Sequence, residues 1–326
     1  MVRIAVLDDY QHVALDVADW SALPPDAEVT VFSDHLSDRG AVIERLRDFE
    51  VVVAMRERTP FPADLLRKLP KLRLLVTTGA ANAAIDVEAA MAQGVTVCGT
   101  GSARYGTAEL TWGLILALAR QIPQEDRAIR EGRWQTTLGM GLKGKTLGIL
   151  GLGNLGGQVA HVANAFGMRV VAWSQNLTAE RAREAGATLV ARDELLRDSD
   201  VVTIHLKLSE RTRGLIGARE LALMKPTAYI VNTSRGPIID EAALVDALER
   251  GVIGGAGLDT FDVEPLPAGH PFLRLQNVVL TPHVGYVIDE GYEQYYGNAV
   301  ENIAGFLRGA PVRVIREGAG YAPGIT

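Results

Sequence analysis

A glycine-rich segment at residues 148–157 limits what this chain can fold into more than any other feature. The run at 145–150 is apolar and strand-like, and residues 154–166 carry apolar side chains at helical spacing. Such a turn needs a first glycine for its tight bend, a second for close approach of a pyrophosphate, and a third for packing helix on strand. With another strand-like run at 169–173, the spacing predicts a dinucleotide-binding turn built on Gly151, Gly153 and Gly156.

Composition is consistent with a globular protein of two domains. The chain has 326 residues, of which 48% are hydrophobic, and a net charge of -6. The acidic balance and the scattered basic residues predict no nucleic-acid partner. The single cysteine, Cys98, excludes an internal disulfide and predicts a reducing, cytoplasmic location. The N-terminus has no signal-peptide pattern, and no apolar run approaches the ~20 residues that a membrane span needs.

Two series of strands and helices are expected along the chain. The first series has strands near 3–8, 29–32, 51–55, 73–77 and 95–98. The second follows one long helix at 108–130 and has strands near 146–150, 169–173, 200–204, 228–231, 254–258 and 278–280. A helix at 289–308 comes next, and residues 311–316 are expected to return to the first series.

This order predicts an α/β protein with two doubly wound parallel-sheet domains. The larger would be a Rossmann nucleotide-binding domain inserted into a smaller flavodoxin-like substrate domain. The expected boundaries are 102–289 for the dinucleotide-binding domain and 1–101 plus 290–326 for the discontinuous substrate-binding domain.

Three polar segments each follow an apolar strand of the second series. They are residues 232–236, 258–265 and 280–285, and they contain Arg235, Glu264 and His283 respectively. The carboxyl ends of strands form the ligand crevice of a doubly wound sheet. An arginine, a glutamate and a histidine in one crevice can hold a carboxylate, tune a proton donor and protonate an oxygen. Hydride chemistry on a 2-oxo acid requires these three functions.

These segments and several others closely resemble the D-isomer-specific 2-hydroxyacid dehydrogenase family over nearly the whole chain. The other matching motifs are Thr78-Gly79-Ala80 with Asp86, Ala108-Glu109, Leu142-x-Gly144-Lys145-Thr146, Met224-Lys225-Pro226 and Gly236-Pro237-Ile238-Ile239-Asp240-Glu241. The resemblance implies an NAD(P)-dependent oxidoreductase that acts on the CH-OH group of a small D-2-hydroxy acid, or on its 2-oxo partner.

The resemblance also implies roles for individual residues. Arg235 would bind the substrate carboxylate, His283 would exchange the proton, and Glu264 would orient the imidazole and favour its charged form. Substrate-binding residues would be Thr78, Gly79, Ala80, Arg235 and Tyr286, with Thr78-Gly79-Ala80 offering backbone amides. Cofactor-binding residues would be Gly151, Gly153, Asn154, Leu155, Gly156, Ser174, Gln175, Lys207, Thr233, Ser234, Asp259 and Gly285.

The remaining candidates receive weaker or structural roles. Asn82-Ala83-Ala84 and Tyr286 depart from the common family pattern, and both are expected to reshape the substrate pocket. Candidate wall residues are Arg56, Trp112, Tyr286 and Tyr292, although core packing is favoured for Trp112. His205 is expected to be a wall residue near the cofactor, whereas surface or packing roles are expected for His12, His35, His161 and His270. No metal site is expected, because no histidines or carboxylates have ligand spacing.

The chain departs from the sequence pattern of NAD-selecting folds at the end of the strand-like run at 169–173. An NAD-selecting strand ends in an acid about 20 residues after the glycines, whereas here the strand is followed by Ser174-Gln175. A missing carboxylate relieves repulsion of a 2′-phosphate. We therefore expect NADPH to be accepted and modestly preferred, with Lys207 supplying part of the phosphate contact.

Two questions remain open from the sequence. The pocket walls come from loops, so glyoxylate, hydroxypyruvate and larger 2-oxo acids are all compatible substrates. A dinucleotide-sensing protein that resembles the corepressors of this fold is the alternative function.

Family resemblance also implies a homodimer, formed partly by the helical arm at 102–134.

Overall fold

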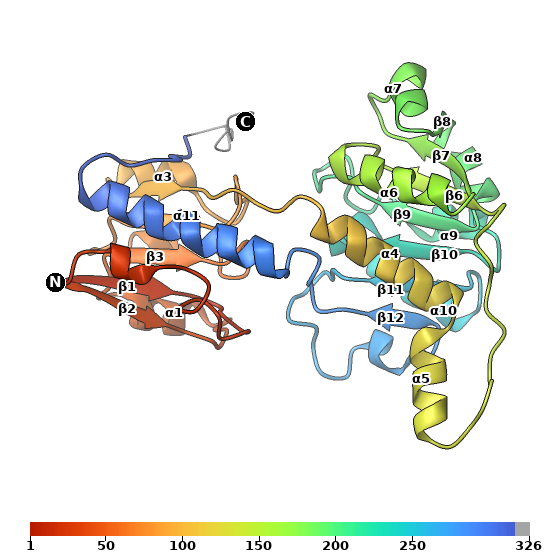
Figure 1. Cartoon of the computed structure of the whole chain (residues 1–326), viewed down its shortest axis with the longest axis horizontal. Coiled ribbons are helices and arrows are strands. Elements are labelled where there is room, and N and C mark those ends of the chain that lie inside the picture. Colours follow the sequence, from red (N-terminus) through yellow and green to blue (C-terminus); the bar gives the residue numbers. More distant parts are fainter. Residues whose placement is uncertain (317–326) are drawn as a thin grey trace. The chain divides into compact units, whose positions relative to one another are not determined.

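The computed structural model describes residues 1–316, and these form two compact units. Unit 1 comprises Met1–Ala103 and the chain from Val287 onward, and unit 2 is Arg104–Tyr286. Residues 317–326, which end the expected substrate domain, lie outside the described residues. Figure 1 labels most of the helices and strands of both units.

Unit 1 is built on a five-stranded parallel sheet. Its strand order is β2-β1-β3-β4-β5, the flavodoxin-like order, as predicted. The strands are β1 (Val2–Val6), β2 (Ala27–Val31), β3 (Val51–Ala54), β4 (Leu74–Thr77) and β5 (Thr96–Cys98). The helices are η1 (Trp20–Ala22), α1 (Arg39–Leu46), α2 (Ala63–Leu66), α3 (Val87–Ala92) and α11 (Asp289–Leu307).

The C-terminal part of the described chain belongs to unit 1. Helix α11 packs against β4 and buries Tyr295 and Tyr296 completely. After it, the backbone N–H of Ile315 donates to the carbonyl of Val97 over 2.8 Å. The expected return of residues 311–316 to the first sheet is therefore confirmed.

Unit 2 is built on a seven-stranded parallel sheet of order β12-β11-β10-β9-β6-β7-β8, the Rossmann arrangement. The strands are β6 (Thr146–Leu150), β7 (Arg169–Trp173), β8 (Thr188–Leu189), β9 (Val201–Ile204), β10 (Tyr229–Asn232), β11 (Gly255–Leu258) and β12 (Val278–Leu280). Six of these strands were expected. The short edge strand β8 was missed, because two residues are too few to show a period.

Helices cover both faces of the unit 2 sheet (Figure 1). Helices α4 and α6 pack on one face, together with Leu147, Val201 and Val231. The other face carries Leu150, Val202 and Ile230, which pack against α8, α9 and α10. The alternation follows from the two-residue period of a strand buried on both sides. The bounds are α4 (Gly106–Ala119), α5 (Ile122–Arg130), α6 (Asn154–Ala165), α7 (Ala179–Glu184), α8 (Arg192–Asp198), α9 (Ala218–Leu223), η2 (Gly236–Ile238), α10 (Glu241–Glu249) and η3 (Pro271–Arg274).

The single long helix expected at 108–130 is wrong in one respect. The structure has two helices, α4 and α5, separated at Gln121, which adopts a left-handed conformation with φ of 54°. The next helix then begins with a proline in its first turn, a position that proline favours because its missing N–H is not needed there. The apolar pattern continues across the break, so periodicity alone does not reveal it.

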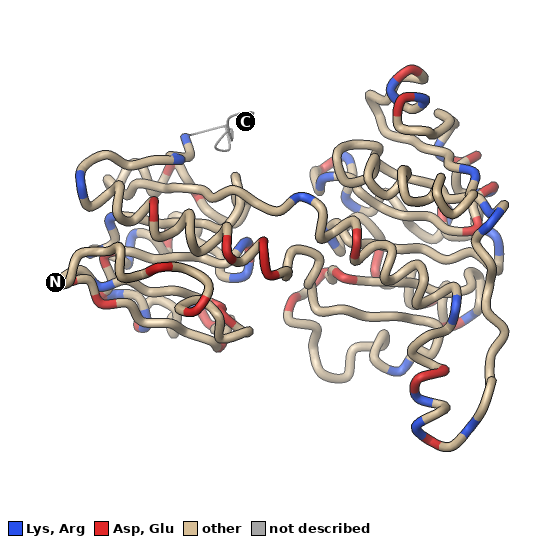
Figure 2. The backbone as a smooth tube through the Cα atoms, in the orientation of Figure 1, with Lys and Arg blue, Asp and Glu red and all other residues tan. Residues whose placement is uncertain are grey.

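Charged residues of both signs are interspersed over each unit (Figure 2). Among residues 1–316, no helix combines the length and apolar character needed to cross a bilayer. Over the same range, no three histidine, cysteine or acidic side chains are grouped as metal ligands.

Candidate active site

The glycine turn of unit 2 has the geometry that a dinucleotide requires. Gly151 has φ of 103°, and a Cβ there would lie 2.7 Å from the backbone of His205. A Cβ on Gly156 would lie 2.2 Å from the carbonyl oxygen of Gly151, so helix α6 approaches the turn closely. At Gly153, by contrast, a Cβ would meet no atom within 4 Å, and space is open for a ligand.

Helix α6 begins directly after this turn. Gly153 is its N-cap and supplies no side-chain cap, and the first amides of the helix, those of Asn154 and Leu155, have no acceptor among the described residues. Such amides are suited to a phosphate, because they add hydrogen bonds to the positive end of the helix dipole. The residues present therefore fit a dinucleotide.

The neighbouring strand ends place the other expected cofactor residues. Ser174 and Gln175 follow β7, where the carbonyl of Ser174 accepts the N–H of Leu177 in a turn. Lys207 follows β9, is exposed, and forms no ion pair within the described part of the chain. Strands β7 and β9 flank β6 on opposite sides, about 10 Å apart.

Arg235 is held at the end of β10 by a compact loop. The side chain of Asn232 accepts the N–H of Ser234 over 3.0 Å and donates to the carbonyl of Arg235 over 2.9 Å. The guanidinium of Arg235 donates to the carbonyl of Ser234 over 2.8 Å and is partly exposed. Thr233 and Ser234 turn inward, toward Thr111 and the carbonyl of Leu206.

His283 and Glu264 form a hydrogen-bonded pair. The distance between His283 Nδ1 and Glu264 Oε2 is 2.7 Å, and Glu264 Oε1 accepts the N–H of Phe261 over 2.9 Å. The side chains of His283 and Glu264 remain 25% and 35% exposed. Nδ1 is bonded to the carboxylate, whereas the Nε2 atom has no hydrogen-bond partner within residues 1–316. Nε2 is therefore available to exchange a proton with a substrate.

Asp259 braces the loop that carries His283. Its carboxylate accepts three hydrogen bonds, from Thr281 Oγ1 at 2.7 Å, the N–H of Val284 at 2.8 Å and the N–H of Gly285 at 2.9 Å. Asp259 is buried, and burial raises the pKa of its carboxyl above the usual value. The bonds hold His283 at its left-handed φ of 54°. Asp259 was expected only beside the cofactor, so this bracing role was missed.

The three catalytic candidates lie at one edge of one sheet. The last residues of β10, β11 and β12 are in register, with Asn232 opposite Leu258 and Leu258 opposite Leu280. Gly236 brings the loops still closer, because a Cβ there would lie 2.1 Å from the carbonyl carbon of Phe261. The edge therefore presents a guanidinium and a carboxylate-bound imidazole to the same side.

The loop Thr78-Gly79-Ala80 of unit 1 differs from expectation. The N–H of Thr78 donates to the carbonyl of Ala54, and that of Gly79 donates to Thr100 Oγ1 over 2.7 Å. Two of the three amides expected for the substrate are thus already bonded inside unit 1, and only that of Ala80 is not. The reason is that the loop is folded into the sheet edge rather than presented as an open nest.

Arg56 and Asn82 complete this loop. Arg56 Nη1 donates to the carbonyl of Thr78 over 3.1 Å and covers Gly79 so closely that a Cβ there would lie 1.8 Å away. The amide of Asn82 donates to the carbonyl of Arg56 over 2.6 Å and to Thr77 Oγ1 over 2.9 Å. Asn82 is therefore buried and joins Arg56 to β4, and its expected effect on the shape of the substrate pocket stays a prediction.

The other histidines divide into two groups. Burial lowers the pKa of His205 to about 4, so its imidazole is neutral near pH 7 and donates to or accepts from Thr203. His35 pairs with the buried Asp8 at 3.0 Å, and His270 pairs with Glu241 at 3.0 Å. Surface or packing roles were expected for His35 and His270, and the structure gives each of them an acidic partner. Only the fold reveals these partners, which are distant in sequence.

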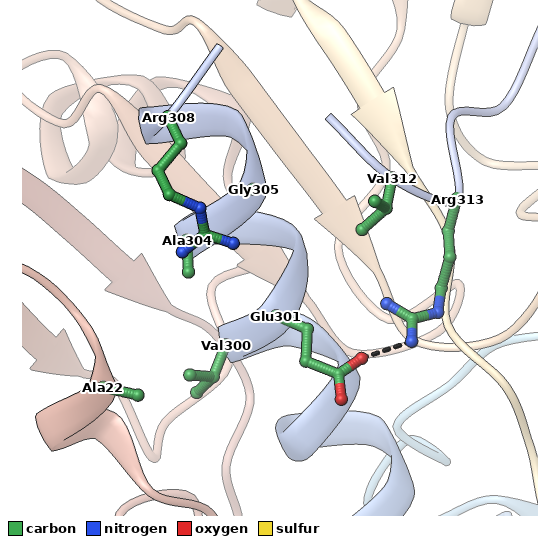
Figure 3. Close-up of a pocket in the computed structure, with 8 residues that line it drawn as sticks. All are labelled: Ala22, Val300, Glu301, Ala304, Gly305, Arg308, Val312 and Arg313. Carbon is green, nitrogen blue, oxygen red and sulfur yellow. Dashed lines mark hydrogen bonds and ion pairs between the residues drawn. The ribbon is translucent and has the colours of Figure 1, made fainter. Parts of the chain in front are cut away.

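A separate hollow in unit 1 contains none of the expected site residues. Its volume is about 550 Å³, and Figure 3 shows the ion pair between Glu301 and Arg313 at its edge. The lining residues are Ala22, Val300, Glu301, Ala304, Gly305, Arg308, Val312 and Arg313.

Comparison with known proteins gives the family. Residues 112–285 match the model described as D-isomer specific 2-hydroxyacid dehydrogenase, NAD binding domain. The chain belongs to the D-isomer specific 2-hydroxyacid dehydrogenase family. A glyoxylate reductase of Aeropyrum pernix is 43% identical over 256 residues, which cover 76% of each chain. A hydroxypyruvate reductase of Blautia hydrogenotrophica is 32% identical and covers 97% of this chain and 100% of the relative.

Solved structures agree with this D-2-hydroxyacid dehydrogenase assignment. A phosphoglycerate oxidoreductase from Vibrio cholerae o395 superposes with a TM-score of 0.90 at 39% identity, over 95% of this chain and 100% of that one. The predictions of a two-sheet α/β fold, of an oxidoreductase and of a nicotinamide cofactor are confirmed at the level of the family. The named relatives are enzymes, so the corepressor-like alternative is not favoured.

Proposed function

We propose that the chain interconverts a small 2-oxo acid and its D-2-hydroxy acid by hydride exchange with NAD(P)(H). The observation that carries this proposal is the 2.7 Å bond from Glu264 to His283 at the sheet edge that also carries Arg235. Unit 2, which contains the glycine turn, would bind the dinucleotide, and unit 1 would serve as the substrate-binding domain.

Each residue at the edge has a defined task in reduction. Arg235 binds the substrate carboxylate through its planar fork. His283 gives the proton on Nε2 to the carbonyl oxygen, and Glu264 holds the opposite ring nitrogen and stabilises the imidazolium. When bound, the nicotinamide supplies the hydride to the carbonyl carbon, and the reverse reaction returns both the hydride and the proton.

The substrate class rests on Arg235 and on the names of the relatives. Glyoxylate, hydroxypyruvate and phosphoglycerate, which appear in those names, are all small acids. The partly exposed guanidinium is suited to such a carboxylate. The amide of Ala80 and the guanidinium of Arg56 are candidate substrate-binding groups of unit 1. In unit 2, Tyr286, whose ring lies 5.6 Å from that of His283, is a candidate wall residue.

We further propose that NADPH is accepted and modestly preferred over NADH. Ser174 follows β7 without an acidic neighbour, and Lys207, which forms no ion pair within residues 1–316, follows β9. The absence of a carboxylate removes repulsion of the 2′-phosphate, and Lys207 is long enough to add attraction.

We propose that two copies associate partly through the arm of unit 2 at residues 102–134. Ile122, Ile129 and Trp134 of this arm are exposed by 52%, 54% and 74%, and Leu138, just beyond it, is exposed by 98%. A hollow of about 600 Å³ lies among Ile122, Ile129 and Trp134. Exposed large apolar side chains beside such a hollow favour a subunit interface, with charged residues such as Arg120, Glu125 and Arg133 at its rim.

A substrate panel tests the proposed activity. Purified protein is mixed with NADPH or NADH and with glyoxylate, hydroxypyruvate or larger 2-oxo acids, and loss of the reduced-nicotinamide absorbance is followed. Turnover is expected with at least one small 2-oxo acid and is expected to disappear in His283→Ala. Cofactor binding without turnover on any acid would instead favour the dinucleotide-sensing alternative.

A further inference from the structure

Unit 2 contains a second glutamate–histidine pair beside the first. His270 Nε2 lies 3.0 Å from Glu241 Oε1, and the two side chains are only 14% and 24% exposed. Glu241 is the first residue of α10, and His270 immediately precedes η3. None of the expected functional residues belongs to this pair.

The two pairs differ in which ring nitrogen is used. His270 Nδ1 accepts the N–H of Phe272 over 3.3 Å, so the ring proton is on Nε2 and is donated to Glu241. Both nitrogens of His270 are therefore used inside the protein. In the His283 pair, by contrast, only Nδ1 has a hydrogen-bond partner among residues 1–316. His270 is thus a fixed structural donor rather than a second acid.

Glu241 reaches the turn that carries Glu264. Its Oε2 accepts the N–H of Asp262 over 3.3 Å, and Glu264 Oε1 accepts the preceding N–H, that of Phe261, over 2.9 Å. Two adjacent backbone amides are thus held by two different carboxylates. The same turn lies against Gly236, where a Cβ would come within 2.6 Å of the nitrogen of Asp262.

We propose that Glu241 and His270 are positioning residues for the reaction: by fixing the 261–264 turn, they set the alignment of Glu264 on His283. This inference rests on the proposed function of the Glu264–His283 pair. It assigns no contact with substrate to either residue. The bond from His270 holds the Glu241 carboxylate in the orientation in which it reaches Asp262.

The effect of nearby charges must be distinguished from the effect of the hydrogen bonds that fix the 261–264 turn. Asp262, Asp240 and Arg213 lie near Glu241, and the pKa of Asp262 is raised by burial and by the neighbouring carboxylates of Glu241 and Asp240. The charged groups near His283 include Glu264 and Asp259, and Arg235 lies at the same sheet edge. Asp262→Asn removes a charge near Glu241 but keeps the backbone amide, and it therefore serves as the electrostatic control.

A matched pair of variants at His270 isolates the hydrogen bond between His270 Nε2 and Glu241. His270→Asn keeps an acceptor near the Nδ1 position for Phe272 and loses the donor to Glu241. His270→Gln keeps a donor near the Nε2 position. Glu241→Gln tests the link from its other end, because an amide can accept from Asp262 or from His270 but not from both. Glu264→Gln removes the carboxylate that bonds His283, and its shift is therefore the reference with which the shifts of the other variants are compared.

Two measurements are made on each variant. Histidine NMR on the cofactor-free protein gives the titration midpoint of His283, identified by its disappearance in His283→Gln. The pH dependence of the reduction rate gives the alkaline limb. In His270→Asn and in Glu241→Gln, we expect both to move to lower pH by about 0.5 units and kcat to fall about tenfold, since a loosened carboxylate favours imidazolium less.

The outcomes distinguish the two proposals. His270→Gln and Asp262→Asn are expected to keep the wild-type midpoint and limb. Equal shifts in His270→Gln and His270→Asn, an unmoved midpoint in Glu241→Gln, or a full shift in Asp262→Asn would overturn the positioning role. If Glu264→Gln itself moves neither quantity, the proposed function of Glu264 fails, whatever the other variants do.

Discussion

At the scale of single residues, the planar fork of Arg235 is the feature that a lysine cannot reproduce. Arg235→Lys keeps the charge but loses bidentate binding of a carboxylate, and we expect kcat/KM to fall at least ~100-fold, or about 2.7 kcal/mol of transition-state stabilisation. Steady-state kinetics measures the loss, and calorimetry should show unchanged cofactor binding. The exposed Arg213, changed to lysine, is the control. Turnover close to wild type in Arg235→Lys would remove the residue from the mechanism.

His205 makes stability depend on pH through its burial. Its pKa is about 4 in the folded protein and 6.5 in an unfolded chain. Between these values only the unfolded state binds the proton, so stability is lost as pH falls from 6.5 to 4, by up to about 1.4 kcal/mol per pH unit.

His205→Gln should remove the contribution of His205 to the pH dependence of the free energy of unfolding, while it keeps a hydrogen-bond partner for Thr203. Urea unfolding at several pH values measures it, with the exposed His161→Gln as the control. Identical slopes in wild type and His205→Gln would show that this imidazole is not the group responsible.

At the scale of elements, the contact of α6 with the glycine turn can be tested by one methyl group. Gly156→Ala would place a Cβ 2.2 Å from the carbonyl oxygen of Gly151, so the helix must move. We expect a loss of about 1–3 kcal/mol in stability and weaker cofactor binding.

The adjacent helical glycine provides a matched control. A Cβ on Gly157 would meet no atom within 4 Å, so Gly157→Ala should stabilise the helix by roughly 0.5–1 kcal/mol. Thermal unfolding and cofactor titration compare the two variants. Equal behaviour would contradict the close approach seen between α6 and the turn.

The strand ends around β6 provide the test of cofactor choice. Ser174→Asp restores a carboxylate at the end of β7, and it should shift the ratio of kcat/KM for NADPH over NADH at least ~10-fold toward NADH. Lys207→Ala should shift the ratio in the same direction by less. A strong preference of the wild type for NADH would refute the preference we propose, and an unchanged ratio in Lys207→Ala would remove that residue from it.

At the scale of the whole molecule, the exposed arm of unit 2 predicts association. Trp134→Asp together with Ile129→Glu places charges on the apolar surface and should convert a dimer into monomers. Light scattering after size-exclusion chromatography measures the mass. Met91→Glu changes an apolar residue of unit 1 that is about as exposed as Ile129, and it should leave the mass unchanged. A monomeric wild type would show that the arm has another role.

Much of the architecture could be predicted because it depends on local patterns. The apolar runs of β6 and β9, the glycine spacing and the polar residues after β10, β11 and β12 are readable along the chain, since strand period and turn chemistry involve near neighbours. Where the local signal is weak, the prediction failed. The two-residue β8 was missed, and the break at Gln121 was hidden by a continuous apolar pattern.

The sequence by itself determined the two parallel sheets, the position of the glycine turn and the identity of Arg235, Glu264 and His283. Only the tertiary structure decided which polar groups form hydrogen bonds with each other. Asp259 accepts from the loop that carries His283, and Asn82 donates to the carbonyl of Arg56. Thr100 accepts the amide of Gly79, and Glu241 bonds both His270 and the amide of Asp262. These partners are about 20 to 30 residues apart. Buried polar groups must find partners wherever packing brings them, so their pairing depends on the folded arrangement and not on local spacing.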